Sequence, residues 1–145
     1  MDSKNEPLKL ENQLCFALYV CSKEIIRCMK PYLEKIGLTY TSYIALMGLW
    51  EEDGISVNEL GNKLYLDSGT LTPLLKKMEK DGLIVRKRSE KDERTVIISL
   101  TEKGRAIKIS CADVRSKVSG NVAITHETVQ EILPKLHNLI SALTK

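Results

Sequence analysis

The chain has 145 residues, of which 43% are hydrophobic and 28% are charged, and its formal net charge is +3. This balance is typical of one globular domain, and the longest apolar run, Leu14–Cys21, is far shorter than the ~20 residues of a membrane helix. The polar segment Met1–Glu6 is unlike a signal peptide, so we expect a cytoplasmic protein with no membrane partner.

The first third of the chain predicts two helices. Apolar residues recur at helical spacing from about residue 8 to residue 36, and Gly37 is a natural stop. Pro31 lies inside this span and predicts a kink or a division of the helix. A second helix is predicted from Thr39 to Trp50.

The middle third predicts a helix-turn-helix followed by a hairpin. Ser56 and Glu59 have the spacing of a capping box before a short helix that ends near Leu64. The next helix ends near Asp81 and begins either at residue 67 or 68 or at Thr72, which would place Pro73 in the favoured first position. Two β-branched runs, 83–88 and 95–100, then flank a charged turn and predict a β-hairpin.

The C-terminal third predicts two more helices. Thr101 caps the first, which runs to about residue 118, and a break is expected at 119–121. The last helix is predicted from about Glu127 to Leu143. The first and last helices carry more apolar surface than a small core needs. They are expected either to form a dimer interface or simply to cover the core.

The basic charge is concentrated in the middle third: residues 60–105 hold 11 Lys and Arg against 7 Asp and Glu, whereas residues 1–59 hold 6 against 9. A basic hairpin is most often a solvated edge. Next to a helix-turn-helix it predicts a wing beside a recognition helix that enters the DNA major groove. The expected contacts to DNA bases and phosphates are Asp67, Ser68, Thr70, Thr72, Lys76, Lys77, Arg86, Lys87, Arg88 and Arg94.

Several segments resemble one known family. The segment Tyr65–Glu79 is similar to the recognition helix of MarR-type transcriptional regulators, and Asp92-Glu93-Arg94 with Leu100-Thr101-Glu102 is similar to their wing and its exit. The segment Leu10–Tyr19 resembles the start of the organic hydroperoxide-sensing branch of that family.

The resemblance implies a mainly α fold with a small β-hairpin wing (α+β), in a single MarR-like domain spanning residues 1–145 that forms a homodimer. Residues 8–36 and 102–145 would supply the dimerisation helices, and residues 55–100 the winged helix-turn-helix. The double-stranded DNA partner would be a palindromic operator, because two-fold symmetry places two recognition helices about 34 Å apart.

The resemblance also implies a sensing site. Cys15 matches the cysteine that an organic hydroperoxide oxidises, and Tyr19 and Tyr40 match tyrosines that hydrogen-bond it, Tyr40 from the partner subunit. A third tyrosine of the branch is replaced by Met29, which cannot donate a hydrogen bond. Asp92 would stabilise the wing by pairing with its arginine, Arg94.

Without the resemblance, the residues themselves give weaker support for Cys15 as the sensing cysteine. The positive end of a helix dipole stabilises a thiolate near the helix start, and Tyr19 lies four residues on, on the same face. The alternative is a buried core thiol, which is the usual state of a free cysteine. Cys21 and Cys28 are expected to be structural thiols.

Cys111 is a candidate for the resolving cysteine that some members of the branch use, but the matching position falls some nine or more residues beyond it. A mixed disulfide with a low-molecular-weight thiol is the simpler expectation. The cysteines include no C-x-x-C, and His126 and His137 have no metal-ligand spacing with them, so neither a metal site nor a cofactor is predicted.

We therefore expect a redox-sensing repressor, not an enzyme, that releases its operator when Cys15 is oxidised. One alternative is a MarR-type regulator that responds to a small aromatic ligand and whose cysteines are incidental. A distant alternative is a thiol peroxidase, which the sequence disfavours because it has neither a C-x-x-C nor a thioredoxin-like βαβ pattern.

Overall fold

The computed structural model describes residues 7–122 and 124–145, so the segment Met1–Glu6, which is unlike a signal peptide, lies outside the described residues. The fold is mainly α with a small antiparallel sheet, as expected. A 3₁₀ turn, η2 (Leu10–Asn12), precedes the other elements, which are α1 (Leu14–Lys35), α2 (Tyr40–Glu51), β1 (Ile55–Ser56), α3 (Val57–Leu64), α4 (Ser68–Lys80), β2 (Ile84–Arg88), β3 (Val96–Leu100), α5 (Glu102–Asn121) and α6 (His126–Leu143).

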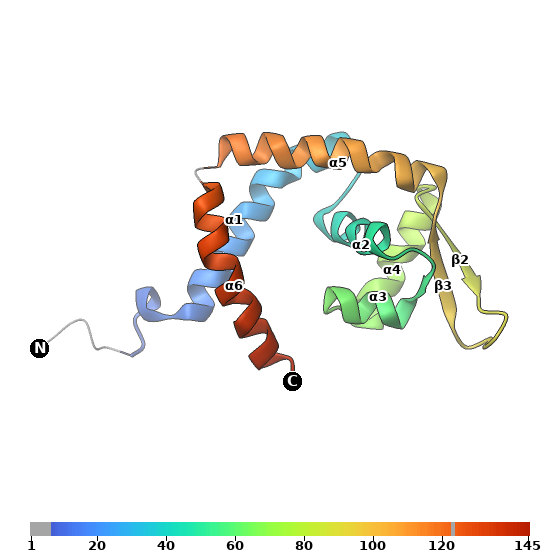
Figure 1. The fold of residues 1–145 in the computed structure, drawn as a ribbon, viewed down its shortest axis with the longest axis horizontal. Helices are drawn as coiled ribbons and strands as arrows, with labels where there is room; N and C mark the ends of the chain where they lie inside the picture. The colour runs from blue at the N-terminus through green and yellow to red at the C-terminus, as the bar shows by residue number, and fades with distance from the viewer. Residues whose placement is uncertain (1–6, 123) are drawn as a thin grey trace, which may run out of the picture.

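The molecule has two ends joined by α5 (Figure 1). The first half of α1 and the whole of α6 lie at one end, and α2, α3, α4 and the β2–β3 hairpin lie at the other. The hydrophobic core belongs to the second end. Leu46 of α2, Leu60 of α3, Leu71 of α4 and Ile98 of β3 are all fully buried there.

Several local predictions are confirmed by the structure. The Ser56 hydroxyl accepts from the Glu59 N–H at 3.1 Å, and Glu59 Oε2 accepts from the Ser56 N–H at 2.7 Å, so the capping box forms. The Thr101 hydroxyl caps α5 by accepting from the Gly104 N–H. The hairpin pairs Ile84 with Leu100 and Arg88 with Val96.

The long first helix begins later than predicted and is not divided. Backbone N–H groups of Asn12 and Gln13 donate to the Lys9 and Leu10 carbonyls and close the η2 turn, and α1 starts only at Leu14. The helix then continues through Pro31 to Lys35. Met29 and Leu33 bury their side chains on either side of the proline, and this packing holds the helix although one backbone hydrogen bond is lost.

The tertiary structure also settles the start of α4. The Asp67 carboxylate accepts from the Thr70 N–H at 2.7 Å and starts the helix at Ser68, so Pro73 lies within it. The sheet has a third strand, β1, which pairs Ile55 with Ile98. The break predicted at residues 119–121 is wrong: α5 continues to Asn121, and the Thr125 hydroxyl caps α6.

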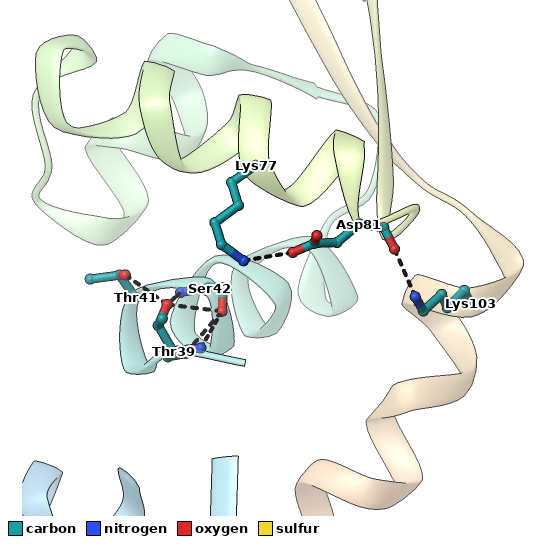
Figure 2. A network of polar contacts seen from close by, with 6 residues as sticks. All are labelled: Thr39, Thr41, Ser42, Lys77, Asp81 and Lys103. Atoms are coloured by element: carbon teal, nitrogen blue, oxygen red, sulfur yellow. Dashed lines mark hydrogen bonds and ion pairs between the residues drawn. The ribbon is translucent and has the colours of Figure 1, made fainter. Parts of the chain in front are cut away.

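Helix α5 is joined to the wing and to α2 by polar contacts. Trp50 Nε1 donates to the Gly104 carbonyl at 2.9 Å, and Asp53 accepts from both the Leu100 N–H and Arg105 Nη2. On the other side of α5, Lys103 Nζ donates to the Asp81 carbonyl at 2.7 Å (Figure 2). These contacts connect the start of α5 directly to the end of α4 and to the hairpin.

Candidate functional site

The helix-turn-helix is built on a close approach of α3 to the turn that follows it. A Cβ atom on Gly61 would lie 2.7 Å from the Leu66 carbonyl oxygen, so only glycine permits this packing. Leu60 and Leu71 are fully buried between the two helices. The start of α4 is therefore held rigidly relative to α3.

The exposed face of α4 follows from its buried face. Leu71, Leu75 and Met78 are buried, so the 3.6-residue period places Gly69, Pro73, Lys76 and Lys80 on the opposite side, and all four are exposed. Lys80, which sequence reasoning did not single out, thus shares the outward face with Lys76. The four-residue spacing of the two lysines is the signal that would have found it.

The short polar residues at the start of α4 have structural roles as well. Asp67 is the N-cap of α4, and its hydrogen bond from the Thr70 N–H lowers the pKa of its carboxyl. The Thr72 hydroxyl donates to the Ser68 carbonyl at 2.7 Å. A carboxylate is stabilised by the helix dipole at this position, whereas DNA phosphates would repel it. Asp67 therefore stabilises the start of α4 as its N-cap.

Lys77 lies on a different side of α4 from Lys76. Its Nζ is 2.8 Å from Asp81 Oδ2, and Figure 2 shows the two side chains pointing toward each other. Lys77 also lines a pocket with Ile36 and Gly37, at the α1–α2 connection. The structure thus does not bring Lys77 together with the outward lysines of the same helix.

The wing is attached to α4 through Arg86. Glu79 accepts from the Arg86 backbone N–H at 3.0 Å and from Arg86 Nε and Nη2 at 3.3 and 3.2 Å. These hydrogen bonds lower the pKa of the Glu79 carboxyl, and the bond from the Arg86 backbone N–H has the largest effect. Glu79, another residue that sequence reasoning missed, neutralises Arg86 and fixes the wing against the recognition helix.

At the tip of the wing, Asp92 shapes the turn. Its carboxylate accepts from the Arg94 backbone N–H at 3.0 Å and from the Thr95 hydroxyl at 3.3 Å. Within residues 7–122 and 124–145, no contact joins Asp92 to the Arg94 guanidinium, and the side chains of Arg94 and Lys87 have no partner. Arg88 donates to the Glu93 carbonyl at 2.8 Å and so belongs to the turn itself.

Cys15 is the second residue of α1 and is exposed. It lies closer to the helix start than predicted, in the first turn, where backbone N–H groups have no helical partner. Tyr19 is exposed one turn further along, with Lys23 Nζ 5.4 Å from its ring centre. Leu14 and Phe16, the neighbours of Cys15, are exposed apolar residues.

A single chain does not bring Tyr40 to Cys15. Tyr40 starts α2 and lines a small pocket with Ile26, Lys30 and Leu33 of α1. Ile26 follows Cys15 by 11 residues, which is about 16 Å along a helix. Met29, at the position of the tyrosine expected from the resemblance, is 9% exposed and packs in the core.

Cys111 is in a very different environment. Its side chain is 2% exposed, and burial raises the pKa of its thiol to about 11. It lines a pocket of about 770 Å³ between α2 and α5, together with Tyr43, Trp50, Lys108 and Arg115. A thiol with so high a pKa is almost entirely protonated near neutral pH and is a poor nucleophile.

Comparisons with known proteins agree with this architecture. Residues 27–110 match the family model described as transcriptional regulator SarA/Rot. The chain is 47% identical to the organic hydroperoxide resistance transcriptional regulator of Bacillus subtilis (strain 168), over 99% of this chain and 97% of the relative. It is 48% identical to the HTH-type transcriptional regulator SarZ of Staphylococcus aureus, over 91% of this chain and 89% of the relative. The chain belongs to the MarR-type family of transcriptional regulators.

A solved structure of the same fold is AbfR, which is known from Staphylococcus epidermidis. The DNA-bound, reduced form of AbfR superposes on this MarR-type regulator with a TM-score of 0.81 and 32% identity, covering 98% of this chain and 99% of that chain. Two further structures of AbfR match as well. The overoxidised form bound to DNA has a TM-score of 0.79 and 33% identity, and the disulfide-formed AbfR has a TM-score of 0.68 and 34% identity. The MarR-like, winged-helix fold expected from the sequence is thereby confirmed.

Two further findings concern the described part of this MarR-type regulator. None of its helices has both the length and the apolar character needed to cross a membrane. No group of three or more His, Cys, Asp or Glu side chains comes close enough together there to hold a metal ion.

Proposed function

We propose that this protein is a dimeric repressor that binds a palindromic operator and releases it when an organic hydroperoxide oxidises Cys15. The observation that carries the proposal is the exposed Cys15 in the first turn of α1, surrounded by exposed apolar side chains. The relatedness to a regulator named for organic hydroperoxide resistance supports it. The test is operator binding by wild-type and Cys15→Ser proteins with and without cumene hydroperoxide.

The proposed DNA interface is the winged helix-turn-helix of residues 55–100. The exposed start of α4, with Ser68, and its outward face, with Lys76 and Lys80, enter the major groove, and the free guanidinium of Arg94 lies at the tip of the wing for the minor groove. The DNA-bound AbfR structures support DNA binding by a chain of this fold. Lys76 and Lys80 neutralise phosphates, whereas Arg86 is already neutralised by Glu79.

The difference between the exposed Lys76 and the neutralised Arg86 predicts different salt dependences of operator binding for their variants. Lys76→Ala should reduce the slope of log K against log[salt] by about 1 per protomer, because one phosphate contact releases one counterion. Arg86→Ala should leave the slope nearly unchanged, and Glu79→Gln should steepen it by freeing the Arg86 charge. Fluorescence anisotropy titrations between 50 and 300 mM KCl measure these slopes. Equal slope losses for Lys76→Ala and Arg86→Ala would contradict the assignment.

The proposed dimer interface is formed by residues 8–36 and 102–145. No residue of α6 is buried, although Val129, Ile132, Leu133, Ile140 and Leu143 are large and apolar. Leu10, Leu14 and Phe16 leave a similar apolar surface at the start of the chain, and Figure 1 shows α6 and the start of α1 at the same end of the molecule. Surfaces of this kind are stable in water when a second copy covers them.

Accordingly, Ile132→Glu should convert the dimer to a monomer, because it places a charge within the exposed apolar surface of α6 that the partner would cover. Sedimentation velocity at micromolar concentration measures the change. The matched control is Asn138→Glu, which adds the same acid on the opposite, polar side of the same helix and should remain dimeric. An Ile132→Glu protein that sediments as a dimer would show that α6 is not at the interface.

The proposed redox step uses the Cys15 thiolate as the nucleophile. Its sulfur attacks a peroxide oxygen, the O–O bond breaks, and an alcohol leaves while Cys15 becomes a sulfenic acid. A low-molecular-weight thiol then forms a mixed disulfide with Cys15 and releases water. Tyr19 of the same helix and Tyr40 of the partner subunit would donate hydrogen bonds to the sulfur. Antiparallel packing of two α1 helices would supply Tyr40 in trans.

Cys111 is not favoured as the resolving thiol. Its burial and its raised pKa leave little thiolate to attack the sulfenic acid of Cys15. The one-cysteine route with an external thiol therefore fits this chain better than a disulfide between Cys15 and Cys111.

The pocket between α2 and α5 favours a second candidate function, a response to a small aromatic ligand. Its aromatic and apolar wall lies next to the cations of Lys108 and Arg115, which suits an aromatic carboxylate. Isothermal titration with salicylate, followed by operator binding in its presence, tests this function. Salicylate binding that releases DNA from both wild-type and Cys15→Ser proteins would favour it over redox sensing.

A further inference from the structure

The turn between α3 and α4 contains an unusual residue, Tyr65. Among the described residues it is the one non-glycine with a positive φ, at φ 56° and ψ 38°, whereas Gly37, Gly54 and Gly82 account for the others. A side chain is disfavoured in this left-handed region, where glycine or asparagine is usual. Glycine at position 65 would thus suit the backbone better, and the presence of tyrosine requires another reason.

That reason is not found inside the chain. The Tyr65 side chain is 66% exposed, and its hydroxyl has no hydrogen bond to any of residues 7–122 or 124–145. Its ring makes no contact with another aromatic ring or with a cation in that part of the protein. The neighbours Leu64 and Leu66, in contrast, pack against the core. Strain at an exposed, unpartnered side chain is typical of a functional contact.

The position of Tyr65 indicates what that contact is. It lies two residues before Asp67, the cap of α4, and the close packing of Gly61 against Leu66 holds this turn in place. A polar groove of about 320 Å³, lined by Asn58, Asn62 and Ser68, opens beside the turn. When the start of a recognition helix enters the major groove, the turn before it meets the phosphates at the groove edge.

We propose that Tyr65 binds the DNA backbone, with its phenol hydroxyl donating a hydrogen bond to a phosphate beside the major groove. The proposal rests on the DNA-binding function proposed above and adds a neutral, sequence-independent anchor that positions α4. The close packing of Gly61 on Leu66 fixes the backbone of this turn before DNA arrives, so only the side-chain torsions of Tyr65 are ordered on binding.

Two substitutions separate the hydroxyl from the backbone conformation. Tyr65→Phe removes only the hydroxyl and should weaken operator binding about tenfold, which is typical of a lost hydrogen bond to a charged group. Tyr65→Asn suits the left-handed conformation and should keep the melting temperature equal to that of the wild type or raise it by a few degrees, yet bind DNA as weakly as Tyr65→Phe or more weakly. The probes are a duplex carrying the palindrome that the wild type selects from a random pool, and a random-sequence duplex of equal length.

The salt dependence identifies the kind of contact. A neutral phenol releases no counterion, so Tyr65→Phe should lower affinity by a similar factor at every salt concentration and on both duplexes. Lys76→Ala, the matched control, should instead reduce the salt slope.

Unchanged affinity of Tyr65→Phe and Tyr65→Asn, with Lys76→Ala impaired, would overturn the Tyr65 proposal alone. If neither Lys76→Ala nor the Tyr65 variants changed binding, both the Tyr65 proposal and the proposed interface would be overturned. A Tyr65→Asn protein that melts well below the wild type would also overturn it, because the side chain would then stabilise the fold.

Discussion

Cys15→Ser protein should stay bound to its operator in cumene hydroperoxide, whereas the wild type should lose about 10- to 100-fold in affinity. The wild-type Cys15 sulfur gains an oxygen, which then leaves as water when a thiol forms a mixed disulfide with Cys15. This new group lies in the first turn of α1, among exposed apolar residues that are expected to pack on the partner. Repacking that surface would change the separation of the two recognition helices. A serine hydroxyl is not oxidised by the peroxide, so the dimer would keep its DNA-binding spacing.

Electrophoretic mobility shift or anisotropy titrations measure this response, and intact-protein mass spectrometry reports the oxidation state. The matched controls are Cys21→Ser and Cys28→Ser, which alter exposed thiols of the same helix, and Cys111→Ser, which alters a buried one. All three should respond like the wild type. Release of DNA by the Cys15→Ser protein would assign the switch to another cysteine. If the peroxide changed the operator affinity of neither protein, the protein would bind DNA without redox control, and the ligand-responsive alternative would be favoured.

Gly104→Ala should destabilise the fold by about 2–4 kcal/mol, because the close approach of α5 to the wing leaves no room for a methyl group. A Cβ atom at position 104 would lie 2.1 Å from the Leu83 carbonyl oxygen and 3.1 Å from a methyl carbon of Leu100. The neighbour that must move is backbone, and the Gly104 carbonyl also accepts the Trp50 hydrogen bond. Relief therefore requires that α5 shift away from both β2 and α2.

Thermal unfolding at fixed protein concentration measures the effect, since the melting temperature of a dimer depends on concentration. A fall of roughly 6–15 °C is expected for a domain of this size. The control is Gly120→Ala in the same helix, where nothing lies within 4 Å of the new methyl group and alanine should be neutral or slightly stabilising. A Gly104→Ala protein as stable as the Gly120→Ala protein would contradict the close packing. Because Gly104 packs α5 against the base of the wing, the operator affinity of the Gly104→Ala protein should also fall.

Local features of the chain were encoded in the sequence by itself. The Ser56 capping box, the Thr101 cap and the two β-branched runs of the hairpin predict their elements because each depends on residues only a few positions apart. The order of these elements predicted the winged helix-turn-helix, whereas the family was implied by the resemblance of the segments Leu10–Tyr19 and Tyr65–Glu79 to known members. The sensing role of Cys15 was implied by resemblance rather than by its surroundings in the sequence, and its exposure came from the structure.

Only the tertiary structure decided what each charged or sulfur-containing side chain faces. It paired Arg86 with Glu79, placed Lys77 beside the α1–α2 connection, left Lys80 outward and buried Cys111 between α2 and α5. It also carried α1 through Pro31 and placed Tyr65 in the left-handed region. These outcomes depend on contacts between segments distant in the chain and on packing energies that outweigh local propensity, so neither spacing nor composition predicts them.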